Sequence, residues 1–253
     1  MYKPLQYIDK TKIFTGLQYH EFSPNLFLSQ YVACYWTVYS VEAIHDVSHR
    51  IIPDGCVDIV FDLNEKISFI TGISDKTEFL NLSGFIRYCG IRFLPKAIPF
   101  ILRDFAIDSL NSYIEIDTKN KILTEMTKWV LDENDIEKII INIQKHLEIF
   151  FRDYTINGNF NTILNYSLAN NGMIHVKDIA GYYKLSEKQI GRYFKENIGI
   201  STKPYLKIIR FQNAYRYFLN RANTSIVQAV DSGFYDQSHL IKDIRFYLGD
   251  TLY

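Results

Sequence analysis

The sequence predicts an α+β protein in which a β-rich domain with following helices precedes an all-α domain. Two observations carry this prediction. Up to about residue 95 the chain holds runs rich in aromatic and β-branched residues, which favour strands, at 31–39, 56–61, 67–73 and 88–93. From Pro99 onward, apolar residues recur instead with helical spacing. The chain of 253 residues is long enough for two hydrophobic cores.

Local signals refine this outline. Pro53-Asp54-Gly55 separates two strand-like runs and predicts a turn, because Pro fixes φ and Gly accepts a positive φ. The helical stretch contains one apolar stripe at i, i+3, i+4, i+7 spacing, made of Ile136, Ile139, Ile140, Ile143, Leu147 and Phe150. Such a stripe packs on its own domain, or else forms a dimer seam or a strut between domains.

The boundary between the domains is predicted at a cluster of turn-forming residues. Asn157-Gly158-Asn159 interrupts the helical pattern and is the expected linker. The first domain then spans residues 1–157, β-rich to about 95 and helical over 96–153. The second domain spans residues 160–253.

Composition and charge narrow the class of protein. A hydrophobic content of 47% and an aromatic content of 15% exclude a disordered chain. Lys and Arg balance Asp and Glu at 28 each, but residues 160–253 hold 12 basic and 7 acidic residues. A basic domain joined to an acidic one is the pattern expected when one domain contacts phosphates.

The cysteines and the N-terminus indicate an intracellular protein. Cys34, Cys56 and Cys89 are far apart and form no CxxC pair, so neither a zinc site nor a disulfide framework is predicted. Free thiols fit a reducing cytosol. No apolar run has the length of a signal peptide core or a membrane span. We therefore expect a soluble, cytoplasmic protein without a membrane partner or a cofactor.

The C-terminal part repeats itself at an offset of fifty residues, most clearly in two short amphipathic helices. Ser186 and Asp236 are good N-caps for them, because each side chain can accept a hydrogen bond from a first-turn N–H. At ~100° per residue, Ile190 and Phe194 share one face of the first helix. The opposite face carries Lys188, Arg192 and Lys195. In the second helix Leu240 and Ile244 are apolar, and Ser238, Lys242 and Arg245 lie opposite.

A shorter apolar helix precedes each of these two. Val176, Ile179 and Ala180 indicate the first, and Ile226, Ala229 and Val230 indicate the second, before a turn at Gly233-Phe234. A short helix, a tight turn and a second helix with an outward basic face form a helix-turn-helix unit, whose second helix enters the major groove of double-stranded DNA. Arg and Lys there donate to guanine or to phosphates.

These residues resemble the AraC/XylS family of bacterial transcription regulators over residues 160–253. The residues that carry the resemblance are 176–180, Leu185, Ser186, Arg192, Phe194, Lys195 and Gly199 in the first unit, Tyr205, Arg210 and Ala214 in a long joining helix, and Gly233, Phe234, 236–240 and Gly249 in the second unit. The ordered set, with these spacings, is specific.

The resemblance implies roles for individual residues. Lys188, Gly191 and Arg192 would face base edges from the first recognition helix, and Ser238 and Lys242 from the second. Lys195 and Arg245 would contact phosphates, which position the protein without reading sequence. Arg210 would be structural. The implied function is sequence-specific binding of an operator, with RNA polymerase as a further partner.

Three residues of the helical domain are unusual for their predicted positions: Val230, Gly191 and Pro204. At the fifty-residue offset Val230 stands where the family prefers a small Ala. If Ala229 is taken as that Ala instead, Ser225 and Gln228 fall on apolar positions, so the support of the second recognition helix is irregular in either case. Gly191 costs roughly 1 kcal/mol of helix stability relative to Ala; it reflects either close approach of the backbone to DNA or simple tolerance. Pro204 fits the first turn of a helix capped by Ser201, which can start at Thr202 and run past Ala214.

Residues 50–61 and 90–95 resemble the cupin-like sensor domain found in part of this family. This resemblance implies a domain that binds a small effector, supports a homodimer, or both. The alternative is a cupin-type binding protein or metalloenzyme with an accessory helical domain, for which His45, His49, Asp54, Cys56 and Asp58 are the available ligands. A cupin metal site needs a His-x-His pair, which the sequence lacks, so we expect a regulator and not an enzyme.

Overall fold

The computed structural model describes residues 2–6, 16–102, 113–116, 121–219 and 237–248. Its N-terminal part contains an antiparallel six-stranded sheet with the order β1-β2-β7-β4-β5-β8 and a second, two-stranded sheet, β3-β6. The six strands are β1 (Leu17–Phe22), β2 (Val32–Ser40), β4 (Val57–Asp62), β5 (Ile67–Thr71), β7 (Arg87–Phe93) and β8 (Tyr113–Glu115); the two-stranded sheet is β3 (Ile44–Ile51) and β6 (Glu78–Gly84).

The four strands expected from sequence are present as β2, β4, β5 and β7, and the α+β class is confirmed. The expectation that residues 96–153 are helical is wrong at one place, since β8 pairs with β5 through Ile114 and Ile70. A strand of three residues carries no periodic signal of its own. The two-stranded sheet of β3 and β6 mixes buried, half-buried and exposed positions, which is why its strands lack a clear hydrophobic signature.

The period of two along the central strands sorts their side chains between two layers. On β4, Ile59 and Phe61 belong to the core under the helices, whereas Asp58 and Val60 face the space between the sheets. On β7 the same alternation turns Ile91 toward the helices and Arg92 toward that space. At these central positions the outer face is apolar, and the inner face carries the charged residues Asp58 and Arg92.

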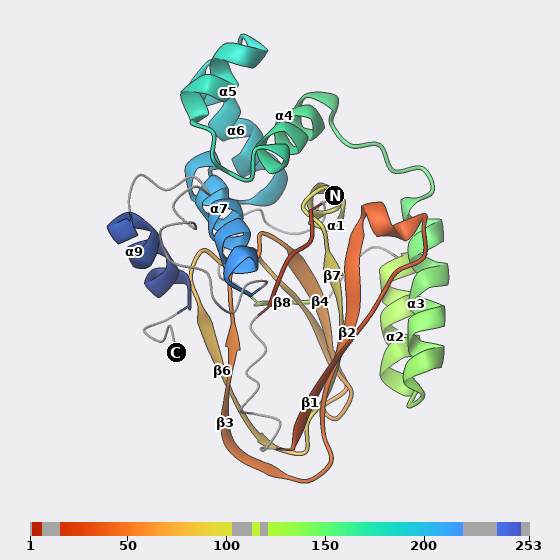
Figure 1. Ribbon diagram of the computed structural model, residues 1–253. Coiled ribbons are helices and arrows are strands. Elements are labelled where there is room, and N and C mark those ends of the chain that lie inside the picture. Colours follow the sequence, from red (N-terminus) through yellow and green to blue (C-terminus); the bar gives the residue numbers. More distant parts are fainter. Residues whose placement is uncertain (1, 7–15, 103–112, 117–120, 220–236, 249–253) are drawn as a thin grey trace.

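Two helices, α2 (Lys121–Asp132) and α3 (Ile136–Phe151), cover the outer face of the larger sheet (Figure 1). The predicted stripe of α3 packs there, with Ile139, Ile143 and Leu147 buried. The ring of Phe151 stacks on Tyr31 at 4.3 Å between centroids. Of the three alternatives for this stripe, packing on its own domain is confirmed. The short helices η2 (Leu28–Gln30) and α1 (Ile98–Ile101) complete this part.

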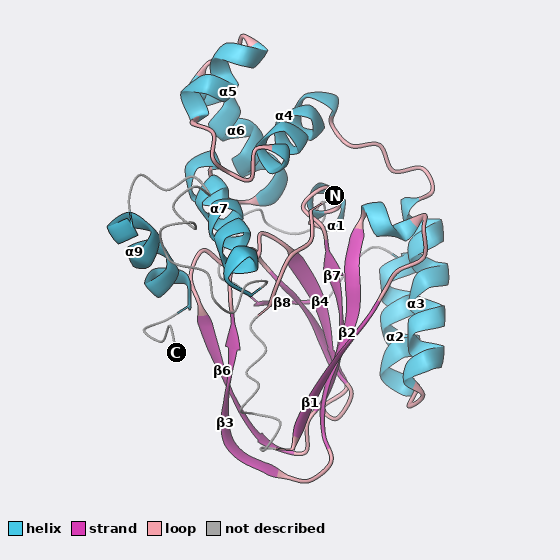
Figure 2. Cartoon of the chain, viewed as in Figure 1, coloured by secondary structure: helices cyan, strands magenta, loops and turns pink. Residues whose placement is uncertain are grey.

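The predicted linker at Asn157-Gly158-Asn159 is wrong by a few residues. Asn157 is the N-cap of α4 (Gly158–Ala169), and its side chain accepts hydrogen bonds from the N–H groups of Asn159 and Phe160. Residues 152–156 make the irregular connection instead, seen at the upper right of Figure 2. Asn can interrupt a helix or begin one, and Asn157 begins α4.

The helical part continues with α5 (Val176–Tyr183), α6 (Glu187–Ile198), α7 (Thr202–Leu219) and α9 (Gln237–Leu248). The joining helix α7 starts at Thr202 and passes Ala214, as predicted. The second unit's leading helix, its turn at Gly233-Phe234 and the cap at Asp236 lie outside the described residues. The first unit can therefore be followed completely, and the second from Gln237 to Leu248.

Gly172, in the turn after α4, sets how closely that turn approaches α7. It has φ +70°, and a Cβ at this position would overlap the backbone oxygen of Leu206 and come within 2.8 Å of the nitrogen of Arg210. Backbone atoms of a helix cannot move aside as a flexible side chain can.

Gly172→Ala should therefore lower the free energy of unfolding by on the order of 2–3 kcal/mol, measured by denaturant titration. Gly181→Ala is the matched control, because a Cβ there meets nothing within 4 Å among the described residues and lies inside α5. That variant should be neutral or stabilising. Equal effects of the two substitutions would contradict the proposed close packing.

Candidate functional site

The turn between α5 and α6 is built from local backbone chemistry. Lys184 ends α5 in the left-handed conformation at φ 53°, and the N–H of Leu185 donates to the carbonyl of Ala180 at 2.9 Å. Ser186 then starts α6 with a capping box, in which its side chain and that of Gln189 satisfy each other's backbone N–H groups. The predicted N-cap at Ser186 is confirmed.

Helix α6 separates its apolar and basic faces as predicted. Ile190 and Phe194 are fully buried, and the ring of Phe194 packs on Phe160 of α4 and Tyr205 of α7. The three predicted basic residues of this helix, Lys188, Arg192 and Lys195, are exposed. Burial of one face thus leaves a row of cations on the other.

Two of these cations have neighbours on their own helix. Arg192 lies 3.8 Å from Glu196 in an exposed ion pair, and Lys195 donates to the carbonyl of Gly199, which ends α6. Gly191 directly precedes Arg192 and is half-buried, and a Cβ there would meet nothing within 4 Å in the described part of the chain. Packing inside the protein therefore gives no reason for a glycine at this position.

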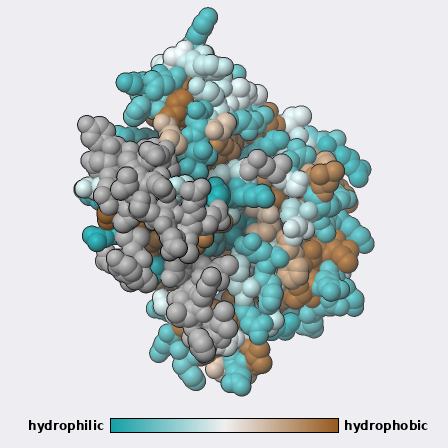
Figure 3. All heavy atoms as spheres, viewed as in Figure 1, coloured by the Kyte–Doolittle hydropathy of each residue, from teal (hydrophilic) through white to brown (hydrophobic). Residues whose placement is uncertain are grey.

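Helix α9, like α6, has one buried apolar face and one exposed basic face. Leu240 and Ile244 are buried, whereas Ser238, Lys242 and Arg245 are exposed. Arg210 of α7 pairs with Asp243 of α9 at 3.4 Å, with both side chains largely buried. This pair fixes α9 on the joining helix and agrees with a structural role for Arg210. In Figure 3 the end of the molecule formed by α5 and α6 is mainly hydrophilic.

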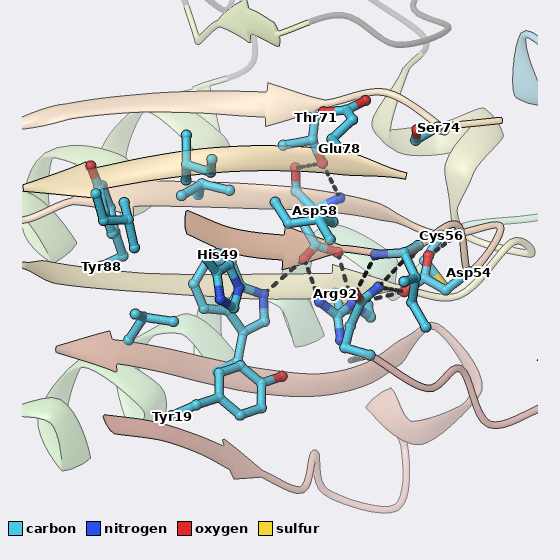
Figure 4. Close-up of a pocket in the computed structure, with 18 of the residues that line it drawn as sticks. Tyr19, His49, Asp54, Cys56, Asp58, Thr71, Ser74, Glu78, Tyr88 and Arg92 are labelled. Carbon is cyan, nitrogen blue, oxygen red and sulfur yellow. Dashed lines mark hydrogen bonds and ion pairs between the residues drawn. The ribbon is translucent and has the colours of Figure 1, made fainter. Parts of the chain in front are cut away.

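The N-terminal part contains a cavity of about 540 Å³ between the two sheets. Most of its wall is apolar or aromatic, from strands of both sheets. Its polar residues include Tyr19, Asp54, Asp58 and Arg92, which lie together in Figure 4. None of the sequence patterns predicted Arg92 or Tyr19 as site residues. A charged residue inside the apolar run 88–93 was the one available signal.

Arg92 is the centre of the polar cluster. Its guanidinium donates to both oxygens of Asp58, from Nε at 3.2 Å and from Nη2 at 3.0 Å, and Nε also lies 3.2 Å from Oδ2 of Asp54. Nη1 is 3.7 Å from the half-exposed Glu21. Trp36 donates from Nε1 to Asp58 at 2.9 Å. One buried guanidinium therefore forms ion pairs with two buried carboxylates.

The buried position of these groups shifts their pKa values. Burial raises the pKa of Asp58 to about 6, and the Asp54 carboxylate adds to the effect, although Arg92 opposes it. Burial also raises the pKa of the Cys34 and Cys89 thiols to about 12 and that of Cys56 well above its ordinary value. These three thiols stay neutral and are poor nucleophiles at neutral pH.

The metal-ligand set considered from sequence is not brought together. Asp54 and Asp58 bind Arg92, Cys56 is buried in the turn, and His45 is exposed on β3 while His49 lines the cavity. Within the described ranges, no three His, Cys, Asp or Glu side chains are placed to hold a metal ion. No described helix is both long and apolar enough to cross a membrane.

The cavity's polar end adjoins the helical part. Gly55, in the predicted turn, has φ +69°, and a Cβ there would lie 3.2 Å from the ring of Tyr205 and 3.3 Å from Ile209, both on α7. Gln212 of α7 is fully buried and donates to the carbonyls of Pro53 at 2.8 Å and Leu5 at 3.0 Å. It also accepts from the N–H of Leu5. The turn and the N-terminal segment thus contact the joining helix.

Comparison with known families assigns the helical part. Residues 179–252 match the family model of a helix-turn-helix domain, and residues 20–115 match a domain of unknown function, DUF6597. Together with the buried and basic faces of α6 and α9, the first match defines a DNA-binding transcription regulator. Its C-terminal domain is a helix-turn-helix domain of the AraC type, which confirms the resemblance found in the sequence.

Other comparisons are more distant. No curated protein matches the chain. Among solved structures, two of ToxT from Vibrio cholerae have 11% and 14% sequence identity, each with a TM-score of 0.41, and cover 92% of this chain and 94% of theirs. A structure of ToxT bound to an unsaturated fatty acid has 12% identity and a TM-score of 0.34, covering 92% of this chain and 91% of its own. The assignment rests on the family match and on the helices themselves.

The raised pKa of Asp58 predicts a pH-dependent contribution to stability. Between the ordinary aspartate value of about 4 and the folded value of about 6, the folded protein holds a proton on Asp58 that the unfolded chain releases. The stabilisation is thus present at low pH and lost as the pH rises through this interval. The free energy of unfolding of wild type minus that of Asp58→Asn should fall between pH 4 and pH 6 in urea titrations. A constant or rising difference would show that Asp58 is not the titrating group.

Proposed function

We propose that this regulator reads an operator mainly with α6, through Lys188, Gly191 and Arg192, and adds base contacts from α9 through Ser238 and Lys242. Lys195 and Arg245, at the edges of the two faces, bind phosphates. The observation that carries this proposal is the repeated division of both helices into a buried apolar face and an exposed basic face. The open space around Gly191 supports close approach of the α6 backbone to DNA.

We further propose a division of labour between two domains, joined through residues 152–156. The domain before this connection binds a small effector in the cavity between its sheets, and the domain after it binds DNA. The cavity supports this role because it is mostly apolar, with a few convergent polar groups at one end. The polar side chains there bind one another, which favours a regulator over an enzyme. We propose that this regulator acts in the cytoplasm.

Control by an effector requires a physical connection between the cavity and the DNA-binding helices. Asp54 lines the cavity, and its Oδ2 accepts from Gln6 at 2.8 Å. The next residue along the N-terminal segment, Leu5, is held at both its N–H and its carbonyl by Gln212 of α7. A ligand that moves Asp54 would therefore act on the helix that joins the two recognition units.

A second copy of the chain and RNA polymerase are further proposed partners, both from the family resemblance. A dimer would present four recognition helices, so its operator would be long or made of spaced repeats. Each pair of units would span about one helical turn of DNA, or ~34 Å.

Substitutions on α6 should separate base reading from phosphate binding. Arg192→Ala should cost about 1–3 kcal/mol at the specific operator and reduce the preference for it, because base contacts are lost. Lys195→Ala should weaken all DNA sequences alike and lower the slope of log affinity against log salt by about 1. Fluorescence anisotropy with an operator selected from genomic fragments and with a random duplex measures both effects.

Lys138→Ala is the matched control, because Lys138 is an exposed cation on α3 in the other domain. It should change neither affinity nor salt slope. If the wild-type chain binds no DNA in a salt-dependent manner, the proposed function fails. If Arg192→Ala and Lys195→Ala behave alike, only the division between base and phosphate contacts fails.

The connection through Gln212 predicts a second phenotype. Gln212→Leu leaves three backbone groups without their partner, the N–H and carbonyl of the partly buried Leu5 and the carbonyl of Pro53, which should lower the free energy of unfolding by about 1–3 kcal/mol. It should also reduce the effect of a cavity ligand on DNA affinity, without abolishing ligand binding. Thermal unfolding and DNA titrations with and without ligand test this. Asn213→Ala, the neighbouring half-buried polar residue of α7, is the control and should retain the coupling.

A further inference from the structure

We propose that the cavity binds a small organic cation, an amine or quaternary ammonium with an apolar body, whose charged group lies beside Asp58 and Asp54. This inference rests on the proposed function, because it names the chemistry of the effector for the site described above. It follows from three properties of the cavity: its shape and wall, its charge, and the position of Trp36.

The cavity has an apolar part and a charged end. Aliphatic and aromatic side chains from both sheets form the apolar part, including Val38, Val60, Phe69, Leu80 and Leu82. The charged end lies where β4 and β7 approach the turn at Asp54, and Figure 4 shows Asp54, Asp58 and Arg92 gathered there, away from Tyr88. A ligand that fits this space is amphipathic, with one polar end.

The charge of the polar end selects the sign of that ligand. Among the described lining residues, Asp54, Asp58 and Glu78 are acidic and Arg92 is the basic one, apart from histidines. Arg92 already binds both aspartates, at 3.0–3.2 Å, and its side chain is only 7% exposed. A carboxylate or phosphate entering here would meet two buried carboxylates and a guanidinium that is already used.

A cation, in contrast, would supply the charge that the cluster lacks. Asp58 and Asp54 share one guanidinium, and burial, together with the neighbouring Asp54 carboxylate, raises the pKa of Asp58 although Arg92 opposes this. A second positive group would interact favourably with both carboxylates in a medium of low dielectric constant. The interaction would be strongest while Asp58 is ionised, which is the case above about pH 6.

Trp36 provides an aromatic surface beside these carboxylates. Its indole covers Gly90 so closely that a Cβ there would overlap the ring, while Nε1 donates to Asp58 and the side chain lines the cavity. Tyr19 of β1 lines the same region. Aromatic rings bind ammonium groups through their π faces, and Trp does so best. An inorganic ion would use the carboxylates alone and leave the apolar part unfilled.

The test compares ligands of opposite charge and similar shape on the full chain. Phenethylamine and phenyltrimethylammonium are the cations, and 3-phenylpropionate is the anion, titrated at pH 7.5 by calorimetry and by thermal shift. We expect at least one cation to bind and to raise the melting temperature, with an affinity at least tenfold above that of the anion. Equal or tighter binding of the anion, or no binding of either cation, would overturn the proposal.

Variants locate the binding. Asp58→Asn should weaken the cation by tenfold or more and remove the preference over 3-phenylpropionate. Asp62→Asn is the control, because Asp62 is a buried aspartate of the same strand that accepts from the N–H groups of Asn64 and Glu65 instead. It should bind like wild type. If Asp58→Asn does not fold, Trp36→Phe should weaken phenyltrimethylammonium more than phenethylamine, and unchanged affinities would then refute the site.

These measurements are independent of DNA. Cation binding without salt-dependent DNA binding would overturn the proposed function and leave the chemistry of the cavity standing. DNA binding without cation binding would overturn the present inference alone.

Discussion

The ion pairs of Arg92 are the constraint on which the rest of the structure depends. A buried guanidinium is tolerated only when its donors have partners. Here the partners are Asp58 of β4 and Asp54 of the turn between β3 and β4. The cluster thereby holds the turn at Gly55 in the position where it contacts Tyr205 and Ile209. Packing between the β-rich part and α7 therefore depends on electrostatics inside the first part.

The sequence predicted those elements whose cause is local. Ser186 caps α6 because its own side chain reaches a first-turn N–H, and the stripe of α3 packs because its spacing alone defines a face. The strand β8 and the connection at residues 152–156 were not predicted. Pairing of β8 with β5 depends on residues far away in the chain, and Asn157 could either end a helix or begin one.

The two functional regions differ in the same way. The basic faces of α6 and α9 could be read from the sequence, because each face lies on one helix with a fixed period. The cavity could not, because Tyr19, Trp36, Asp58 and Arg92 come from four strands whose order is set by long-range pairing. From the sequence, Asp54 and Asp58 are only available ligands for a metal site that the spacing disfavours, and their distances to Arg92 show that they form ion pairs instead.

The hydrogen bond from Lys195 to Gly199 has a consequence for the thermodynamics of association. A free lysine loses much of its rotamer entropy when it is immobilised on a phosphate. Lys195 loses part of that entropy during folding, since one of its three N–H groups already holds the end of α6. The two remaining N–H groups can still donate to an anion. Helix α6 is thus ordered at both ends, by Ser186 and by Lys195, so its backbone would lose little conformational freedom in the proposed contact with DNA.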